Sequence, residues 1–211
     1  MISVRQFMAR FPDEQACRDY LFNIRWPRGF ICTKCGEHKH SYIKTRNLFE
    51  CAICKTQTSI TSGTAMHRTK LPLRYWLLTF YWVASGERIS ARKISIILKL
   101  QYRTALKLLH AVRYAMHKAD TNWLSAFWLP AKPTDHSIVR KAKLGLLKQA
   151  DHFIRKFYGH ISEKYRYHYF SEYWFRSNNA FNPDGALHKL ITSGSMTNYS
   201  INEYRWTCSH A

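Results

Sequence analysis

The chain has 211 residues, 46% of them hydrophobic, so it can bury a sizeable core and is long enough for one or two domains. Its 33 Lys and Arg against 13 Asp and Glu give a formal net charge of +20, which favours a polyanionic partner, nucleic acid above all. No apolar run reaches the roughly 18 residues of a membrane span, and residues 1–10 lack the apolar core of a signal peptide. Composition therefore argues against a membrane or secreted protein, and we expect a cytoplasmic, globular one.

The first predicted element is a short amphipathic lead-in helix. Residues 12–22 begin with two acidic residues, which favour a helix N-terminus, and carry their apolar residues at helical spacing. Pro27 and Gly29 stop the helix, and residues 1–28 form the first predicted segment. Cys17, inside the helix, is most simply a small buried residue.

Residues 29–66 are predicted to form a small sheet organised by a metal ion. Short β-prone runs at residues 41–43 and 47–49 lie beside two Cys-x-x-Cys pairs. Fifteen residues separate the pairs, a spacing that lets two hairpin tips close a tetrahedral thiolate site on one zinc ion. The predicted ligands are Cys32, Cys35, Cys51 and Cys54. Because four thiolates leave no open coordination position, this zinc would be structural rather than catalytic.

The sequence leaves two alternatives for the cysteine pairs and the residues near them. A Cys-x-x-Cys pair can serve redox chemistry, but that use needs a βαβ context, which this segment lacks. His38 or His40 could replace a cysteine ligand, although exposed loop histidines are the simpler interpretation. Nearby lysines would lower the thiol pKa values and so favour metal binding: Lys34, Lys39, Lys44 and Lys55.

Residues 67–118 are predicted to form a helix-turn-helix unit. The expected helices are residues 71–84, 90–98 and 102–118, with a tight turn between the last two. The third has an apolar face opposite a basic one, as a recognition helix in the major groove would, but a solvated face on a core helix fits equally well. The predicted DNA contacts are Arg88, Arg92, Lys93, Arg103, Lys107, His110 and Arg113.

The remaining chain is predicted to be a connector followed by helices. Residues 119–143 form the connector, with helical character resuming near His136, and residues 144–211 form the last segment. A break is expected at Tyr158-Gly159, and a short helix at residues 186–191.

Seven aromatic residues crowd residues 165–175. They could stack on single-stranded bases, but a dense apolar set on a helix normally buries itself, so core packing is the favoured interpretation.

Residues 14–116 closely resemble the front end of insertion-sequence transposases that carry an N-terminal zinc ribbon before a DDE-type catalytic domain. The shared motifs, in order, are Arg25-Trp26-Pro27, Gly29-Phe30, both cysteine pairs, Gly63-Thr64, and Lys70-Leu71-Pro72-Leu73 with Trp76. Residues 89–97 and 104–110 are similar to the helix-turn-helix of that family. The resemblance implies that this front end binds zinc and double-stranded DNA, at the terminal inverted repeats of the element.

The catalytic domain of that family has an RNase H-like fold, in which three carboxylates hold two metal ions for strand transfer. The resemblance resumes only at residues 145–175. The 25 residues from 119 to 143 are too few for the missing sheet, since even small domains need about 50 residues. Leu144 stands where the catalytic Glu would be. The resemblance therefore implies that the chain has lost most of its catalytic core, so that residues 144–211 are a remnant and no residue is catalytic.

Few acidic residues could substitute: Asp120, Asp135, Asp151, Glu163 and Glu172. Asp135 is more simply a helix N-cap, Asp120 lies in the connector, and the other three are interpreted as solvated helix residues. Without a sheet to cover it, the aromatic helix would need another partner, which predicts self-association.

The predicted fold is mainly α with a small β zinc ribbon, followed by a helix-turn-helix bundle and a C-terminal helical segment, without a complete RNase H-like sheet. The predicted function is zinc-dependent, sequence-specific DNA binding without catalysis. Two alternatives remain: an active strand-transferase that uses Mg²⁺, and a basic zinc-ribbon scaffold for RNA or protein.

Overall fold

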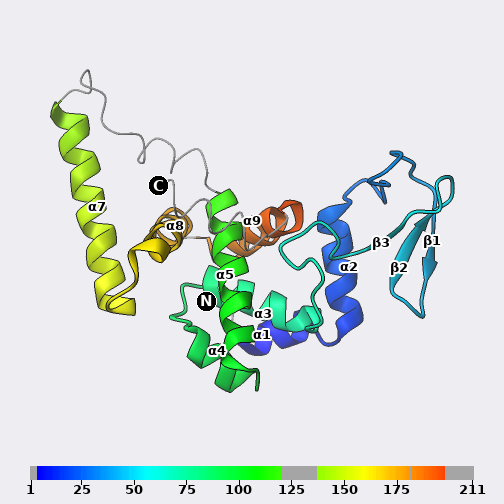
Figure 1. Ribbon diagram of the computed structural model, residues 1–211, viewed down its shortest axis with the longest axis horizontal. Coiled ribbons are helices and arrows are strands. Elements are labelled where there is room, and N and C mark those ends of the chain that lie inside the picture. Colours follow the sequence, from blue (N-terminus) through cyan, green and yellow to red (C-terminus); the bar gives the residue numbers. More distant parts are fainter. Residues whose placement is uncertain (1–3, 120–136, 181, 198–211) are drawn as a thin grey trace.

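A computed structural model describes residues 4–119, 137–180 and 182–197 (Figure 1). The molecule is elongated, with a small sheet at one end, a long helix at the other and a helical body between them. The elements are α1 (Val4–Arg10), α2 (Glu14–Arg25), β1 (His40–Ile43), β2 (Leu48–Cys51), β3 (Gln57–Ser59), α3 (Leu73–Ala84), α4 (Ala91–Ile97), α5 (Tyr102–Ala119), α7 (Ser137–Tyr158), α8 (Glu163–Asn178) and α9 (Pro183–Met196).

The predicted lead-in helix is α2. Its N-cap is Asp13, whose side chain accepts a hydrogen bond from the Ala16 N–H at 2.8 Å, as acidic N-caps do. Glu14, in the first turn, accepts hydrogen bonds from the N–H groups of Leu73 and Arg74, at 2.6 Å and 3.3 Å. Because the N-cap residue of α3, Pro72, makes no side-chain cap hydrogen bond, Glu14 of α2 supplies that cap from another part of the sequence.

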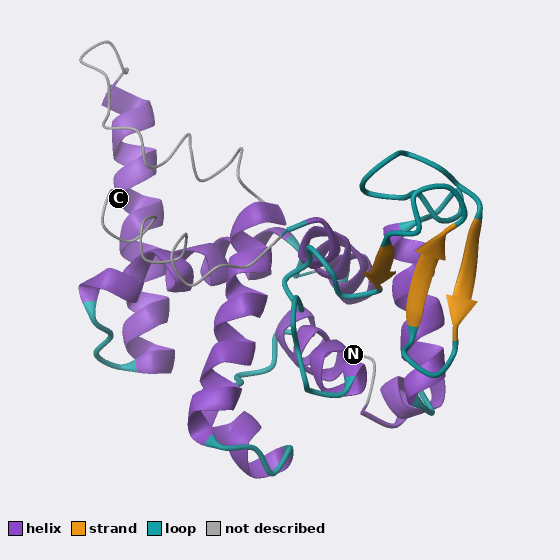
Figure 2. Cartoon of the chain, turned by 45° about the vertical axis from the view of Figure 1, so that its right-hand side comes forward, coloured by secondary structure: helices purple, strands orange, loops and turns teal. Residues whose placement is uncertain are grey.

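The sheet is antiparallel in the order β1-β2-β3 and lies beside α2 (Figure 2). The two predicted β-prone runs are confirmed as β1 and β2. β3 adds a third strand, at one edge of the sheet. Arg25 ties α2 to this edge by donating to the carbonyls of Ser59 and Ile60, at 3.1 Å and 2.7 Å. The rings of Trp26, Phe30 and Phe49 then pack together, so the ribbon is anchored to the helical body through α2.

Helices α3, α4 and α5 confirm the three predicted helical segments. Gly86, with φ of 78°, follows α3, and Ser90 caps α4 by accepting a hydrogen bond from the Lys93 N–H at 3.2 Å. The turn before α5 places Lys99 in the left-handed region, with φ of 51°. Four residues separate α4 from α5, so the second turn is as tight as the sequence predicts.

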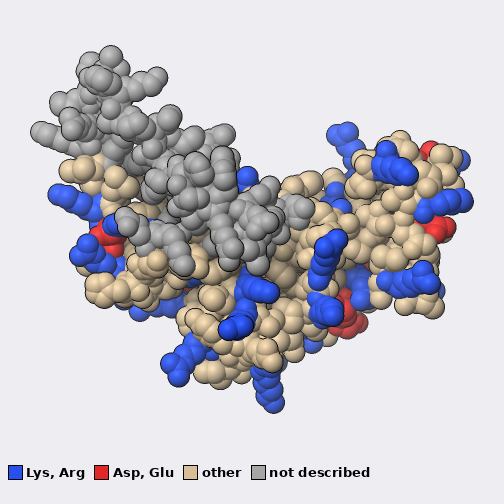
Figure 3. Space-filling view, in the orientation of Figure 1, with Lys and Arg blue, Asp and Glu red and all other residues tan. Residues whose placement is uncertain are grey.

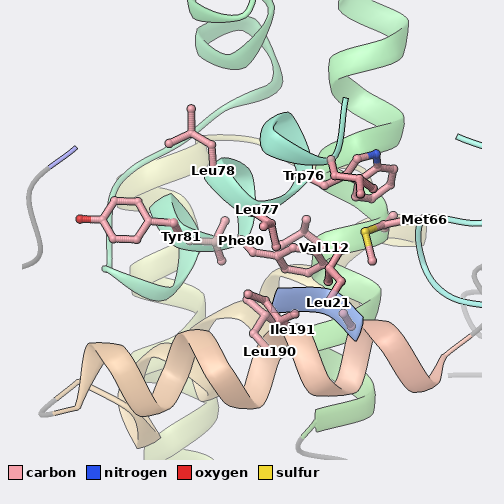
Figure 4. Packing of buried hydrophobic residues seen from close by; sticks show 14 of the residues in the cluster. Leu21, Met66, Trp76, Leu77, Leu78, Phe80, Tyr81, Val112, Leu190 and Ile191 are labelled. Carbon is pink, nitrogen blue, oxygen red and sulfur yellow. The ribbon is translucent and has the colours of Figure 1, made fainter. Parts of the chain in front are cut away.

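Helix α9 completes the core of the helical body. Leu190 and Ile191 are fully buried against α2, α3 and α5, and Figure 4 shows Leu77, Val112 and Ile191 meeting where these helices face one another. The sequence predicts a short helix at residues 186–191, whereas α9 has 14 residues. The segment that follows the aromatic helix is therefore part of the main core.

Helices α7 and α8 form a hairpin that packs on α5 through α8. Ala150 and Ile154 of α7 meet Phe170 and Trp174 of α8 in a second small core, which confirms that the aromatic segment packs internally. Helix α8 thus has α5 and α7 as partners within the chain, and self-association stays a prediction. Helix α7 begins at Ser137, inside the predicted connector, and residues 120–136 of that connector lie outside the described residues.

Within the described residues the sheet is the three-stranded ribbon alone, and no RNase H-like sheet is present, as the predicted fold class requires. None of the described helices is both long and apolar enough to span a membrane.

Candidate zinc site and nucleic-acid interface

The four predicted zinc ligands meet at one point. The Sγ atoms of Cys32, Cys35, Cys51 and Cys54 all lie within 4.8 Å of one another. Three of the S–S distances are 3.4–3.5 Å, close to the edge of about 3.8 Å for a tetrahedron with Zn–S bonds of about 2.3 Å. The four cysteines are therefore arranged for one zinc ion, and four thiolates would satisfy its coordination.

Both cysteine pairs fold into the same local turn. The Gly36 N–H donates to the Cys32 carbonyl at 3.0 Å, and the Lys55 N–H donates to the Cys51 carbonyl at 3.2 Å. Gly36 and Lys55 are in the left-handed region, with φ of 76° and 56°, which turns the chain back after each pair. The repeated turn points each pair of sulfur atoms toward the other pair.

The thiols differ in acidity before any metal binds. Hydrogen bonds with the side chain and the backbone of Thr56 lower the pKa of Cys54 to about 6. For Cys35, the Glu37 N–H lowers the pKa, but hydrogen bonding with the other thiols, Cys54 first, raises it to about 12. For Cys54, Thr56 rather than a flanking lysine is thus the main source of thiolate stabilisation. Four thiolates this close need a cation between them, which zinc supplies.

The two nearby histidines are exposed, as predicted, and lie outside the cysteine group. The His40 ring lies 4.7 Å from the Phe30 ring, so it packs on the aromatic cluster of the ribbon. Cys17 is fully buried inside α2, as predicted.

Four of the predicted DNA-contacting side chains are exposed around the turn between α4 and α5: Arg92, Lys93, Arg103 and Lys107. We call α4, this turn and the first two turns of α5 the helix-turn-helix tip, after the motif that the sequence predicts here. Arg103 and Lys107 lie one helical turn apart on the same face of α5. Lys and Arg side chains project from the lower side of the molecule, where α4 lies (Figure 3).

The tip also exposes apolar side chains that the sequence analysis did not single out. Ile96 is 70% exposed and Tyr102 54% exposed, and Ile97 lies between them in sequence. The sequence feature that could have indicated this exposed apolar surface is Tyr102, an aromatic residue at the first position of the third predicted helix.

Arg113 does not lie on the surface, and we withdraw it from the predicted DNA contacts. It is 2% exposed, and its Nε lies 2.8 Å from Glu172 Oε2 on α8. Its guanidinium also packs on the rings of Tyr158 and Tyr169. Arg113 borders the apolar face of α5, and α8 covers it in the later turns of that helix.

His110 and Arg88 are also drawn toward the C-terminal helices. The half-buried His110 ring lies 5.5 Å from the Tyr165 ring of α8, and burial together with the charge of Arg113 lowers its pKa to about 4. Arg88 is exposed, but its guanidinium lies 4.0 Å from the centre of the Phe157 ring at the end of α7.

Glu172 was predicted to be a solvated helix residue, and this prediction is wrong. Its side chain is 0% exposed and lies 2.8 Å from both Arg113 and Arg176, while the Tyr158 hydroxyl donates to it. Burial alone would raise the pKa of Glu172, but the two guanidinium groups lower it overall. This carboxylate therefore holds α8 against α5.

The structure describes only some of the other acidic residues that were considered as substitutes for the catalytic carboxylates. Asp151 pairs with Arg155 and Arg166 on the surface of the hairpin. Leu144, at the position expected for a catalytic Glu, is 56% exposed. Asp120 and Asp135 lie outside the described residues, as does the side chain of Glu163.

Across the described ranges, the cysteines are the one group of three or more His, Cys, Asp or Glu side chains that could hold a metal ion.

Comparison with known proteins identifies the N-terminal region. Residues 12–57 match the transposase zinc-ribbon domain family. No curated protein and no solved structure matches the chain significantly. The match covers α2, both cysteine pairs and the first two strands, but well under half of the chain. The chain thus carries a transposase-like N-terminus with a zinc ribbon.

Proposed function

We propose that this protein is a zinc-stabilised, sequence-specific binder of double-stranded DNA that reads base edges with its helix-turn-helix tip. The supporting observation is the exposure of Arg103 and Lys107 on the first turns of α5, while the later turns are held by α8 and α9. The start of a recognition helix reaches the bases in the major groove, where Arg and Lys pair with guanine. Arg92 and Lys93 on α4 then contact phosphates.

The proposed target is the terminal inverted repeat of an insertion sequence. The match of residues 12–57 to the transposase zinc-ribbon domain supports this choice. The ribbon adds exposed cations of its own, including Lys39, Lys44 and Arg46, which strengthen attraction to the DNA backbone.

We further propose that the protein does not cleave DNA. The 25 residues from 119 to 143 are too few for an RNase H-like sheet. Two of the acidic residues considered as substitutes are engaged in other roles, Glu172 inside the α5–α8 interface and Asp151 in surface ion pairs.

A salt-titrated binding assay tests this function. Zinc-loaded protein is mixed with duplexes that carry the terminal repeat or a scrambled sequence, with Mg²⁺ or Mn²⁺ present to reveal nicking. We expect tighter binding to the repeat without cleavage. Arg103→Ala is expected to weaken repeat binding about tenfold or more, since a good base contact contributes about 1–3 kcal/mol of discrimination. Arg155→Ala, which removes the same charge from the exposed surface of α7, is the matched control.

Three outcomes would contradict parts of the proposal. Cleavage would favour the active strand-transferase. Equal affinity for duplex RNA would favour the scaffold alternative, and equal loss of binding in Arg103→Ala and Arg155→Ala would place base reading outside the tip.

A further inference from the structure

A cleft separates the helix-turn-helix tip from the corner where α7 meets α8. It has a volume of about 770 Å³, within the range of about 300–1,000 Å³ typical of small-molecule pockets. Residues of α4, α5, α7 and α8 line it. We call this the interhelical cleft.

The lining has the chemistry that a nucleotide requires. The aromatic rings of Tyr102, Phe157, Tyr158 and Tyr169 offer faces for base stacking. Hydroxyl groups and the guanidinium of Arg92 can bond to base edges and phosphate. None of the described lining residues is acidic, and the Glu172 carboxylate behind the inner wall is paired with Arg113 and Arg176.

The inner wall of the cleft is rigidly held. Arg113 is fixed by the carboxylate of Glu172 and lies 4.1 Å from the centre of the Tyr169 ring. Tyr158 donates to the same carboxylate, so three residues of this wall share one buried network. A planar ligand would therefore meet surfaces that are already ordered, which lowers the entropic cost of binding.

The mouth of the cleft is continuous with the tip that is proposed to contact DNA. Arg92 and the exposed Tyr102 belong both to the cleft lining and to the tip, and Arg88 lies over Phe157 at the cleft edge. A DNA chain bound along the tip would thus run past the opening.

We propose that the interhelical cleft binds one unstacked nucleotide of the DNA, beside the segment read by α5. This inference rests on the proposed DNA-binding function and adds a second mode of contact to it. Because an unpaired nucleotide avoids the cost of breaking a base pair, the protein would prefer DNA in which a nucleotide is already unpaired at this position.

The first test is an affinity comparison. Fluorescence anisotropy measures binding of a fully paired duplex and of a set of duplexes with one unpaired thymidine moved stepwise along the site. We expect one position at which the unpaired duplex binds about tenfold more tightly, equivalent to about 1.4 kcal/mol. Phe157→Ala is expected to abolish this preference and to retain binding of the paired duplex. Phe22→Ala, at a half-buried ring on α2 that is outside the cleft lining, is expected to keep the preference.

The second test uses the wild-type chain, so it does not depend on how a variant folds. The unpaired thymidine is replaced by 5-iodouridine in its deoxy form, the complex is irradiated, and mass spectrometry locates the cross-link. We expect attachment to Phe157, Tyr158 or Tyr169. Normal binding of paired DNA with no positional preference and cross-links only outside these residues would overturn the cleft proposal alone. Failure to bind any duplex would overturn the proposed function and the cleft proposal together.

Discussion

Arg113 and Glu172 form an ion pair that is almost completely buried between α5 and α8. Charges removed from water are stabilised here only because each has its partner: Glu172 also bonds to Arg176 and Tyr158. The pair therefore fixes where α8 sits on α5, and with it the inner wall of the interhelical cleft.

Substitution of Glu172 should be costly. Glu172→Gln keeps the size of the side chain but leaves Arg113 and Arg176 without a counter-charge, so we expect the free energy of unfolding to fall by about 3–5 kcal/mol. Chemical denaturation followed by circular dichroism measures this change. Asp151→Asn is the control, because its partner Arg155 has a side chain that is 77% exposed and such surface pairs contribute under about 1 kcal/mol. Small, equal effects of the two substitutions would show that the buried pair does not hold the interface.

Three histidines at the same interface should make stability depend on pH. Burial lowers the pKa of His110 and His117 to about 4 and that of His168 to about 3, with neighbouring cations adding to the effect. In the unfolded chain these groups take up protons near pH 6.5, whereas the folded chain keeps them neutral. Their contribution is thus complete above pH 6.5 and is lost as the pH falls toward 4.

Denaturant titrations at pH 7.5, 6.5, 5.5 and 4.5 are expected to show the free energy of unfolding decreasing across this window. His168→Asn should reduce the slope, whatever its effect on stability at neutral pH. A flat profile between pH 6.5 and 4.5 would mean that these rings take up protons equally in the folded and the unfolded protein.

At the level of the helices, α9 depends on the close approach of one glycine to α3. A Cβ atom at Gly194 would lie 2.9 Å from Phe80 Cζ, closer than real contacts allow. The carbonyl of the same residue accepts the Ala65 N–H at 2.8 Å, which joins α9 to the chain that leaves the ribbon. Helix α9 therefore has little room to shift away from an added methyl group.

Two glycine substitutions form a matched pair. Gly194→Ala is expected to destabilise the protein by about 1–3 kcal/mol through overpacking against Phe80. Gly145→Ala, inside α7, meets nothing within 4 Å and should stabilise it by about 0.5–1 kcal/mol, because Ala favours the helix. Thermal unfolding of both variants measures the difference. A stable Gly194→Ala protein would show that Phe80 can move and that α9 is not clamped.

The elements that the sequence predicts well have strong local signals. Helices α2 to α5 have caps such as Asp13 and Ser90 or a clear apolar pattern, and the ligand set of the ribbon follows from cysteine spacing alone. Helix α1 and strand β3 have 7 and 3 residues, too few for a periodic signal, and depend on partners distant in sequence. Helix α9 contains Gly185 and Gly194, which weaken its helical pattern although the second is needed for packing.

The sequence could not reveal which surfaces of a helix are covered by helices that are distant in the chain. Periodicity predicts Arg103, Lys107, His110 and Arg113 away from the apolar face of α5, and it does not say that α8 covers α5 near His110 and Arg113. Likewise, Glu172 looks like any acidic helix residue until its partner on α5 is known. The sequence therefore predicted the exposed basic residues Arg103 and Lys107 at the start of α5, and it wrongly added the buried Arg113 in the later turns.

Over the whole molecule, the zinc ribbon and the helical body are held together mainly through α2. The strands pair with one another at one end of the chain, whereas α3, α5 and α9 pack together without a strand between them (Figure 1). A small sheet of this kind has little core of its own, so its folding free energy depends on the metal. The helical body has its own apolar contacts and does not.

Removal of zinc should therefore unfold the ribbon and leave the body folded. After chelation we expect most helical circular dichroism at 222 nm to remain, while limited trypsin digestion cuts first at ribbon residues such as Lys39 and Lys44. Cys51→Ser, which removes a buried ligand, should reproduce this pattern without chelator, whereas Cys17→Ala, at a cysteine outside the zinc site, should retain one zinc per chain. Collapse of the whole helical signal on chelation would instead mean that α2 requires the ribbon to stay docked. In that case the helix-turn-helix tip would depend on zinc for its fold, and DNA binding would be lost together with the metal.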